Sequence, residues 1–202
     1  MKTLIGFLFL LSFGLAPAQT ILHDGEITDE GIYLGKHAWH DSASGLPLAE
    51  VIYDPGGVLL SYKTWYQGDI MDAETPDPDR KRESLPVQLA EAIYEQDGWG
   101  FVKYGEAQGK RVQKGQKVWV MYKGWLQDGT VFDDAFKRGK AFKFTTGKQQ
   151  VIPGFERAVL QLAPGEGAYV VVPASLAYRG RAIGVIPPFA DLIYRIEVQE
   201  VR

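Results

Sequence analysis

Few residues in this chain combine the types and the spacing that nucleophilic, metal-dependent or acid–base catalysis requires. The chain has no cysteine, which excludes thiol nucleophiles, thiolate metal sites and disulfides. His37 and His40 would suit a metal ion, but no carboxylate or third histidine stands at a zinc-like spacing apart from the distant His23. Asp133 and Asp134 are neighbours on a predicted strand, so their side chains point apart and do not form an acid–base pair.

Aromatic and aliphatic side chains are the more informative set. The 202 residues include 10 Tyr, 10 Phe and 5 Trp, enough to line a cavity with aromatic rings. The glycines at 147 and at 165 and 167 lack the spacing of a phosphate-binding loop. The formal net charge of −3 leaves no basic surplus for phosphates, so no nucleic-acid partner is expected. An apolar site is therefore the kind of site that this composition favours.

The elements that would position such a site are short strands and one helix. Alternating apolar residues predict strands at 117–123, 142–144, 169–172 and 192–198. In residues 153–162, Phe155, Ala158, Val159 and Leu162 recur at helical spacing. One helix among several strands with glycine and proline turns predicts an α+β fold, in which an antiparallel sheet folds over the helix.

Five stretches of this region carry a resemblance to a known family. They are residues 120–133 (VMYKGWLQDGTVFD), 142–144 (FKF), 147–156 (GKQQVIPGFE), 177–178 (AY) and 186–192 (IPPFADL). Their order and spacing resemble the FKBP-type peptidyl-prolyl cis–trans isomerases from about residue 101 to residue 202, roughly half of the sequence. Nothing before Trp99 takes part in the resemblance.

The resemblance implies an antiparallel half-barrel sheet wrapped around one short helix, with a shallow apolar cavity between them. Its catalytic residues would be Asp133, Tyr178 and Phe142. Its substrate-binding residues would be Tyr122, Phe132, Val151, Ile152, Phe155, Val185, Ile186 and Tyr194. By the same resemblance, the Tyr178 hydroxyl and the Ile152 N–H would donate hydrogen bonds to substrate carbonyls, and Asp133 would be held by the Tyr122 hydroxyl.

Three departures from the family pattern concern substrate preference. Phe155 stands where the family usually has tryptophan, and Tyr194 stands where it often has phenylalanine. The loop between Tyr178 and Val185 is one residue shorter than the commonest form and contains Arg179 and Arg181. A changed preference is the expected consequence, with the fold unaffected.

An apolar cavity suits the isomerisation of an X-Pro bond. Amide resonance sets a rotational barrier of about 18–20 kcal/mol, and the twisted amide at its top has a less charged carbonyl oxygen. A dry cavity disfavours the planar amide more than the twisted one. The expected enzyme is therefore a peptidyl-prolyl isomerase of proline-containing polypeptides that needs no cofactor or metal, and macrolides are its implied inhibitors. The alternative is a non-catalytic chaperone or assembly module that binds proline-containing chains.

The rest of the chain divides into shorter segments. Lys2, the apolar run 4–15 and Ala16-Pro17-Ala18 have the order of a secretory signal peptide, expected at 1–18, which predicts a periplasmic or extracellular protein. The apolar run has 12 residues, too few for a membrane anchor, which takes about 20, and no later segment is expected to span a membrane. A β-hairpin-rich segment is predicted at 19–72, a charged linker at 73–84, a short helix at 85–98 and the isomerase domain at 99–202.

The amino-terminal segment has no function that its residues identify. Trp39, Trp65 and Tyr66 are expected to be exposed, and they motivate the hypothesis that this segment dimerises or docks a partner.

Overall fold

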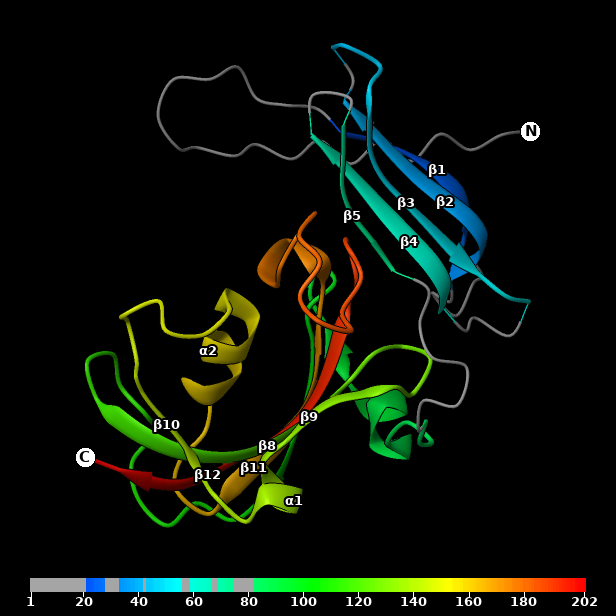
Figure 1. Ribbon diagram of the computed structural model, residues 1–202. Coiled ribbons are helices and arrows are strands. Elements are labelled where there is room, and N and C mark those ends of the chain that lie inside the picture. The colour runs from blue at the N-terminus through cyan, green and yellow to red at the C-terminus, as the bar shows by residue number, and fades with distance from the viewer. Residues whose placement is uncertain (1–20, 28–32, 42, 56–58, 67–68, 75–81) are drawn as a thin grey trace. The chain divides into compact units, whose positions relative to one another are not determined.

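The chain forms two units in the computed structural model, which describes residues 21–27, 33–41, 43–55, 59–66, 69–74 and 82–202 (Figure 1). The predicted signal peptide, residues 1–18, lies outside the described residues. None of the described helices is long and apolar enough to cross a membrane.

The amino-terminal unit is a five-stranded antiparallel sheet whose strands follow one another in chain order. They are β1 (Ile21–Ile27), β2 (Tyr33–Asp41), β3 (Pro47–Tyr53), β4 (Leu59–Tyr66) and β5 (Asp69–Glu74). Each pair of neighbours along the chain is joined as a hairpin, which is the arrangement that the turn-rich sequence predicts. The last strand extends two residues beyond the predicted end of this segment.

One face of this sheet carries its buried side chains. Trp39 pairs with Ala49 across β2 and β3, and Val51 pairs with Tyr62 across β3 and β4; all four are buried. His37 is also buried, with its ring centroid 6.1 Å from that of Trp39. The expectation that Trp39 is exposed is therefore wrong, because its alternation places it on the packed face, where it is 7% exposed. The side chains of Trp65 and Tyr66 lie outside the described ones.

The carboxy-terminal unit is a curved antiparallel sheet with helical segments between its strands. Its strands are β6 (Ile93–Tyr94), β7 (Gly100–Gly105), β8 (Lys117–Trp125), β9 (Val131–Asp134), β10 (Phe142–Thr145), β11 (Glu166–Val172) and β12 (Leu192–Val201). Its helical segments are η1 (Val87–Glu91), α1 (Ala135–Arg138), α2 (Pro153–Val159) and η2 (Ala174–Leu176). The order across the sheet is β10-β8-β12-β11-β7-β6, with β9 pairing to β8.

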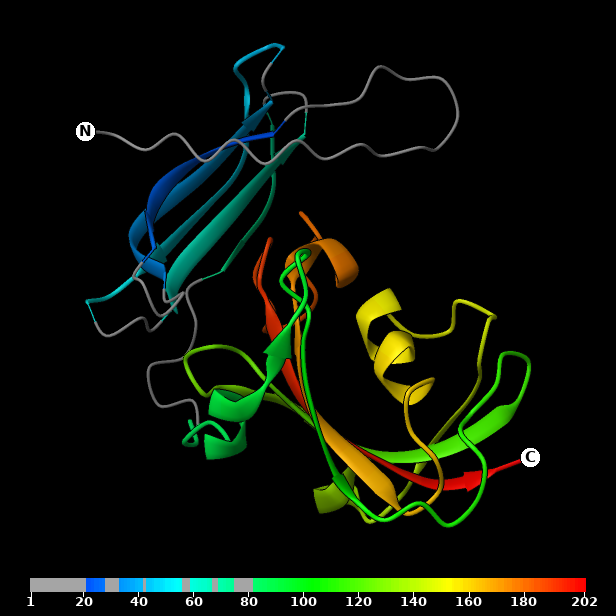
Figure 2. The same cartoon turned by 180° about the vertical axis from the view of Figure 1, so that it is seen from behind.

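The sheet curves around α2, which lies against its concave face (Figures 1 and 2). Pro153 opens the helix at a position where the missing N–H costs nothing. Gly154 then lets the helix approach β11 closely, since a Cβ there would overlap Val172. Phe155, Ala158 and Val159 face the core. The predicted α+β fold, an antiparallel half-barrel around one short helix, is confirmed.

Trp99 anchors the first turn of α2 from outside the half-barrel motif. Its ring is 2% exposed, and its indole N–H donates to the Gly154 carbonyl at 3.2 Å. The Arg157 guanidinium lies 4.3 Å from the centre of the same ring and pairs with Glu95 and Asp97. These contacts fix the turn before β7 against the helix.

The predicted helix at 85–98 is wrong in kind and in length. The chain forms the five-residue 3-10 helix η1 and then the short strand β6, which pairs with β7. Most of its apolar stripe stays exposed: Val87 is 81% and Ile93 is 78% exposed, and Leu89 is half-buried. A helix this short needs packing to be stable, whereas β6 gains ladder hydrogen bonds and the Tyr94 ring covers Gly100.

The end of the predicted linker is bound to the carboxy-terminal unit. Within the stretch 73–84, residues 75–81 lie outside the described ones. The Glu83 N–H donates to the Gly129 carbonyl at 2.9 Å, and its carboxylate pairs with Lys123 at 2.5 Å. Arg82 pairs with Asp128 at 3.5 Å. The carboxy-terminal unit therefore already includes Arg82 and Glu83 and does not begin at Trp99.

Candidate active site

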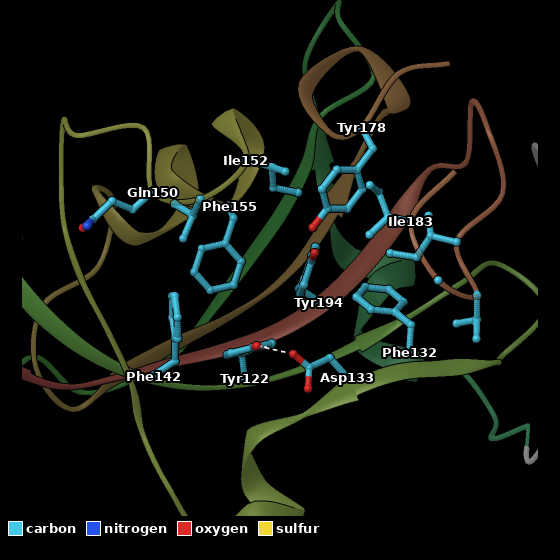
Figure 3. Close-up of a pocket in the computed structure, with 14 residues that line it drawn as sticks. Tyr122, Phe132, Asp133, Phe142, Gln150, Ile152, Phe155, Tyr178, Ile183 and Tyr194 are labelled. Atoms are coloured by element: carbon cyan, nitrogen blue, oxygen red, sulfur yellow. Dashed lines mark hydrogen bonds between the residues drawn. The ribbon is translucent and has the colours of Figure 1, made fainter. Parts of the chain in front are cut away.

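A cavity of about 440 Å³ opens between α2, the strands β8, β9, β10 and β12, and the loop that follows η2 (Figure 3). All eleven residues that the sequence predicts for the site line it. They are Tyr122, Phe132, Asp133, Phe142, Val151, Ile152, Phe155, Tyr178, Val185, Ile186 and Tyr194. Their roles remain predictions, but residues from seven separate stretches of chain meet at one hollow.

Aromatic rings form the floor and one wall of the cavity, mostly edge to face. Tyr122 lies 5.5 Å from Phe155 and 5.9 Å from Phe142 between ring centroids, both nearly perpendicular. Tyr194 lies 5.2 Å from Phe155 and 5.5 Å from Phe132 in the same geometry. Such pairs each stabilise the packing by about 0.5–1.5 kcal/mol beyond burial, so the rings form a fixed surface.

The two rings that depart from the family pattern lie at the bottom of the cavity. Phe155 keeps an aromatic platform there and is buried. Tyr194 is also buried and lines the cavity, with its hydroxyl directed toward Tyr178 (Figure 3). Burial raises the pKa of Tyr194 well above its ordinary value, and the neighbouring Tyr178, Tyr122 and Asp133 add to this. Its hydroxyl therefore adds a neutral polar group to the site.

Asp133 is the carboxylate of the cavity, and two groups hold it. The Tyr122 hydroxyl and the Arg138 guanidinium both donate hydrogen bonds to it. Burial opposes its ionisation, but these donors outweigh burial and hold the pKa of Asp133 below its ordinary value. Burial and the hydrogen bond to Asp133 raise the pKa of Tyr122 to about 12. At neutral pH the pair is thus an ionised carboxylate and a neutral phenol.

Asp134 points away from its neighbour and has a structural role. Its carboxylate accepts a hydrogen bond from the Lys137 N–H at 2.9 Å and so caps α1. It also pairs with Lys123 at 3.3 Å. The prediction that Asp133 and Asp134 do not act together is consistent with this arrangement.

The upper rim of the cavity comes from two loops. Tyr178 follows η2 and directs its hydroxyl into the cavity from above (Figure 3). Ile152 precedes α2, and among the described residues its N–H has no backbone acceptor, whereas its carbonyl accepts two helical N–H groups. Ile183 and Ile186 close a tight turn through two 3.0 Å backbone hydrogen bonds, which presents Val185 to the cavity.

Three lining residues were not predicted from the sequence: Gln150, Ile183 and Gly184. Gln150 and Gly184 are chain neighbours of predicted residues, and Ile183 stands two residues before Val185. Closeness in the chain to the predicted motifs was therefore the available signal, rather than residue type. Arg138 was also missed, although it is the charged partner of Asp133. Arg138 stands five residues after Asp133, and this spacing could have indicated the pair. The helical turn of α1 after β9 brings the guanidinium back to the carboxylate.

Asp191 holds the segment that leads into Tyr178. Its carboxylate accepts hydrogen bonds from the Ala174 N–H at 2.8 Å and from the Gln127 amide at 3.4 Å. Ala174 begins η2, which leads into Tyr178. Burial raises the pKa of Asp191 to about 6, against an ordinary value of 3.8. Its ionised form is therefore destabilised in the folded protein.

We expect Asp191→Asn to stabilise the protein at pH 8 by on the order of 2–3 kcal/mol. The raised folded-state pKa means that the destabilisation develops as the pH rises from about 4 to about 6 and is absent below that window. Asparagine keeps an oxygen for the Ala174 N–H and carries no charge. Urea unfolding at pH 8 and pH 4 measures the effect; an equal gain at both pH values, or a loss at pH 8, would contradict it.

Comparison with known proteins points to one family. The family model for FKBP-type peptidyl-prolyl cis-trans isomerase matches residues 108–199. Over 91 residues the chain is 44% identical to "Peptidyl-prolyl cis-trans isomerase Fkbp12" of Drosophila melanogaster, covering 45% of this chain and 84% of that protein. It is 40% identical over 94 residues to "Peptidyl-prolyl cis-trans isomerase FPR2" of Saccharomyces cerevisiae, covering 46% and 70%.

Solved structures of similar shape agree with this. FkpA from Escherichia coli matches with a TM-score of 0.51 at 28% identity, over 55% of this chain and 51% of that chain. AtFKBP13 matches with a TM-score of 0.50 at 28% identity, over 55% of this chain and 98% of that chain. The chain thus covers about half of the FkpA structure and nearly all of the AtFKBP13 structure.

Proposed function

The chain belongs to the FKBP-type peptidyl-prolyl cis-trans isomerases, and from this premise we propose that it isomerises X-Pro bonds of exported polypeptides inside its aromatic cavity. The observation that carries the proposal is the cavity itself: it is lined almost wholly by apolar and aromatic side chains, and its one carboxylate is already paired. Such a site is poorly suited to acid–base or nucleophilic catalysis and well suited to a change of conformation.

The proposed mechanism is differential stabilisation of the twisted amide. A planar X-Pro amide has a polar carbonyl oxygen, which loses water when it enters the cavity. As the C–N bond twists, resonance is lost and the oxygen becomes less polar, so the apolar walls oppose the transition state less than the ground state. Each 1.4 kcal/mol of this difference, roughly, accelerates the reaction tenfold.

The lining residues take distinct parts in this proposal. Phe142, Ile152 and Phe155 hold the proline ring between strand and helix. The Ile152 N–H and the Tyr178 hydroxyl donate to substrate carbonyls on either side of the reacting bond. Asp133 faces the twisting amide with its charge fixed by Tyr122 and Arg138. These groups orient the substrate, and none of them transfers a proton.

A protease-free isomerisation assay tests the proposal. We expect the purified chain to accelerate cis–trans exchange of an X-Pro tetrapeptide and FK506 to abolish the acceleration, because the macrolide named in relatives such as "FK506-binding protein 2" would occupy the same cavity. Exchange at the uncatalysed rate would contradict the proposed activity. Tight binding of a proline-containing chain without acceleration would instead support the non-catalytic binding module.

We also propose that the protein is exported to a periplasmic or extracellular space. The support is the sequence alone: Lys2, the apolar run 4–15 and the small residues Ala16 and Ala18 before Gln19. Amino-terminal sequencing of the protein from fractionated cells should begin at Gln19. A chain that still begins at Met1 in the cytoplasmic fraction would overturn this proposal and leave the isomerase proposal intact.

A further inference from the structure

A second hollow lies on the outer face of the sheet, around Trp119. Val118 and Val120 on β8 point into the core, so Trp119 between them faces the opposite side. Lys143 on β10 is its register partner. The hollow has a volume of about 490 Å³ and is named here the Trp119 groove; its lining residues are Gly115, Lys117, Trp119, Lys143, Thr145 and Arg202.

The side chains of the groove make it positively charged. The Lys143 ammonium lies 5.9 Å and the Arg202 guanidinium 5.0 Å from the centre of the Trp119 ring. Arg202 is paired with Glu200 at 2.5 Å. Lys117 and Lys143 are exposed, and neither has a carboxylate within 4.0 Å among the described residues. The protein as a whole carries a formal net charge of −3, so the groove is opposite in sign to the chain.

The groove and the isomerase cavity adjoin at the start of β10, on opposite faces of the sheet. Phe142 and Lys143 are consecutive residues of β10, so Phe142 faces the cavity and Lys143 faces the groove. Because β10 is the edge strand of the sheet, a polypeptide can pass around it from one face to the other. At about 3.3 Å per extended residue, crossing a sheet edge roughly 10–15 Å thick takes about three to five residues.

We propose that the Trp119 groove binds acidic residues of the same polypeptide whose proline occupies the cavity. Carboxylates would pair with Lys117 and Lys143, while the methylene groups beside them would rest on the Trp119 ring. Charge complementarity favours an acidic segment as the partner of the groove, because its lining includes two unpaired ammonium groups and no acidic side chain. This inference rests on the proposed function and specifies the substrate class as proline-containing chains with a nearby acidic segment.

Two sets of peptides test the groove on the full chain. Each has the same X-Pro core, with four acidic or four neutral polar residues placed about five residues before or after the proline. We expect the acidic peptides to show a KM about three- to tenfold lower in at least one direction. The difference should disappear in Lys117→Glu/Lys143→Glu, while kcat/KM for an X-Pro tetrapeptide stays unchanged.

A matched variant controls for net charge. Lys110→Glu/Lys137→Glu makes the same change in charge at exposed lysines outside the groove, and it should keep the preference for acidic peptides. Equal KM values for acidic and neutral peptides in the unaltered protein would overturn the proposal, as would equal loss of preference in both variants. If the unaltered protein fails to isomerise the tetrapeptide, the proposed function fails instead, so the two failures are distinguishable.

Discussion

Phe142→Ala is expected to lower kcat/KM for an X-Pro tetrapeptide by about 10- to 100-fold while the protein remains folded. Phe142 is 36% exposed on the edge strand, so its ring contributes little to the core. In the proposed complex the ring would bury its apolar surface against the proline, a contact of about 1.5–3 kcal/mol. If the transition state loses this stabilisation, kcat/KM falls by the stated factor.

The matched control for Phe142 is Phe136→Ala. Phe136 is a half-buried phenylalanine of the same unit, contacts Arg195 and lies outside the cavity lining. We expect this variant to lose some stability and to keep its kcat/KM within about twofold. Isomerisation assays at a temperature where both variants are folded by circular dichroism provide the comparison. Unchanged activity in Phe142→Ala would remove Phe142 from the site.

Phe155→Ala is expected to reduce the free energy of unfolding of the carboxy-terminal unit by about 3–5 kcal/mol. Phe155 is buried among the rings of Tyr122, Phe144 and Tyr194, and its removal leaves a void that those three rings cannot fill. Urea unfolding of the full chain measures the change. The same side chain forms the floor of the cavity. This variant therefore shows how much of the stability of the unit comes from a residue that also lines the site.

Phe155→Leu separates the effect of the lost apolar volume from the effect of the lost aromatic ring. Leucine restores most of the apolar volume, and we expect it to recover more than half of the stability that alanine loses. It does not restore the flat ring that Tyr122 and Tyr194 contact edge to face, so isomerase activity should recover less than stability. A loss below about 1 kcal/mol in Phe155→Ala would show that the core does not depend on this ring.

The strands and α2 were predictable because buried apolar residues recur along the sequence with the period of a strand or a helix. Val118 and Val120 alternate with Trp119 on β8, and Phe155, Ala158 and Val159 share one face of α2. The site residues were predictable for a different reason: they stand within motifs whose order resembles a family. Periodicity alone could not have separated Phe142 from Phe144, although one lines the cavity and the other lies in the core.

The errors arose where tertiary contacts outweigh local pattern. The stripe of residues 87–94 satisfies a helical spacing, but most of its side chains stay exposed, and pairing with β7 stabilises a strand at its end instead. Trp39 was expected to be exposed, but the pairing of β2 with β3 places its ring on the packed face of the sheet. Arg138 was not predicted, because the hydrophobic pattern of the sequence does not indicate that its guanidinium donates to Asp133.

In the proposed mechanism the cavity stabilises a twisted amide, and no proton is transferred. The direct measurement is kcat/KM for an X-Pro tetrapeptide with the full chain in H₂O and in D₂O. A catalytic carboxylate or phenol that moved a proton in the transition state would slow the reaction in D₂O by about twofold or more. We predict a ratio of about one; a ratio near two or above would contradict the mechanism and assign chemistry to Asp133 or a tyrosine hydroxyl.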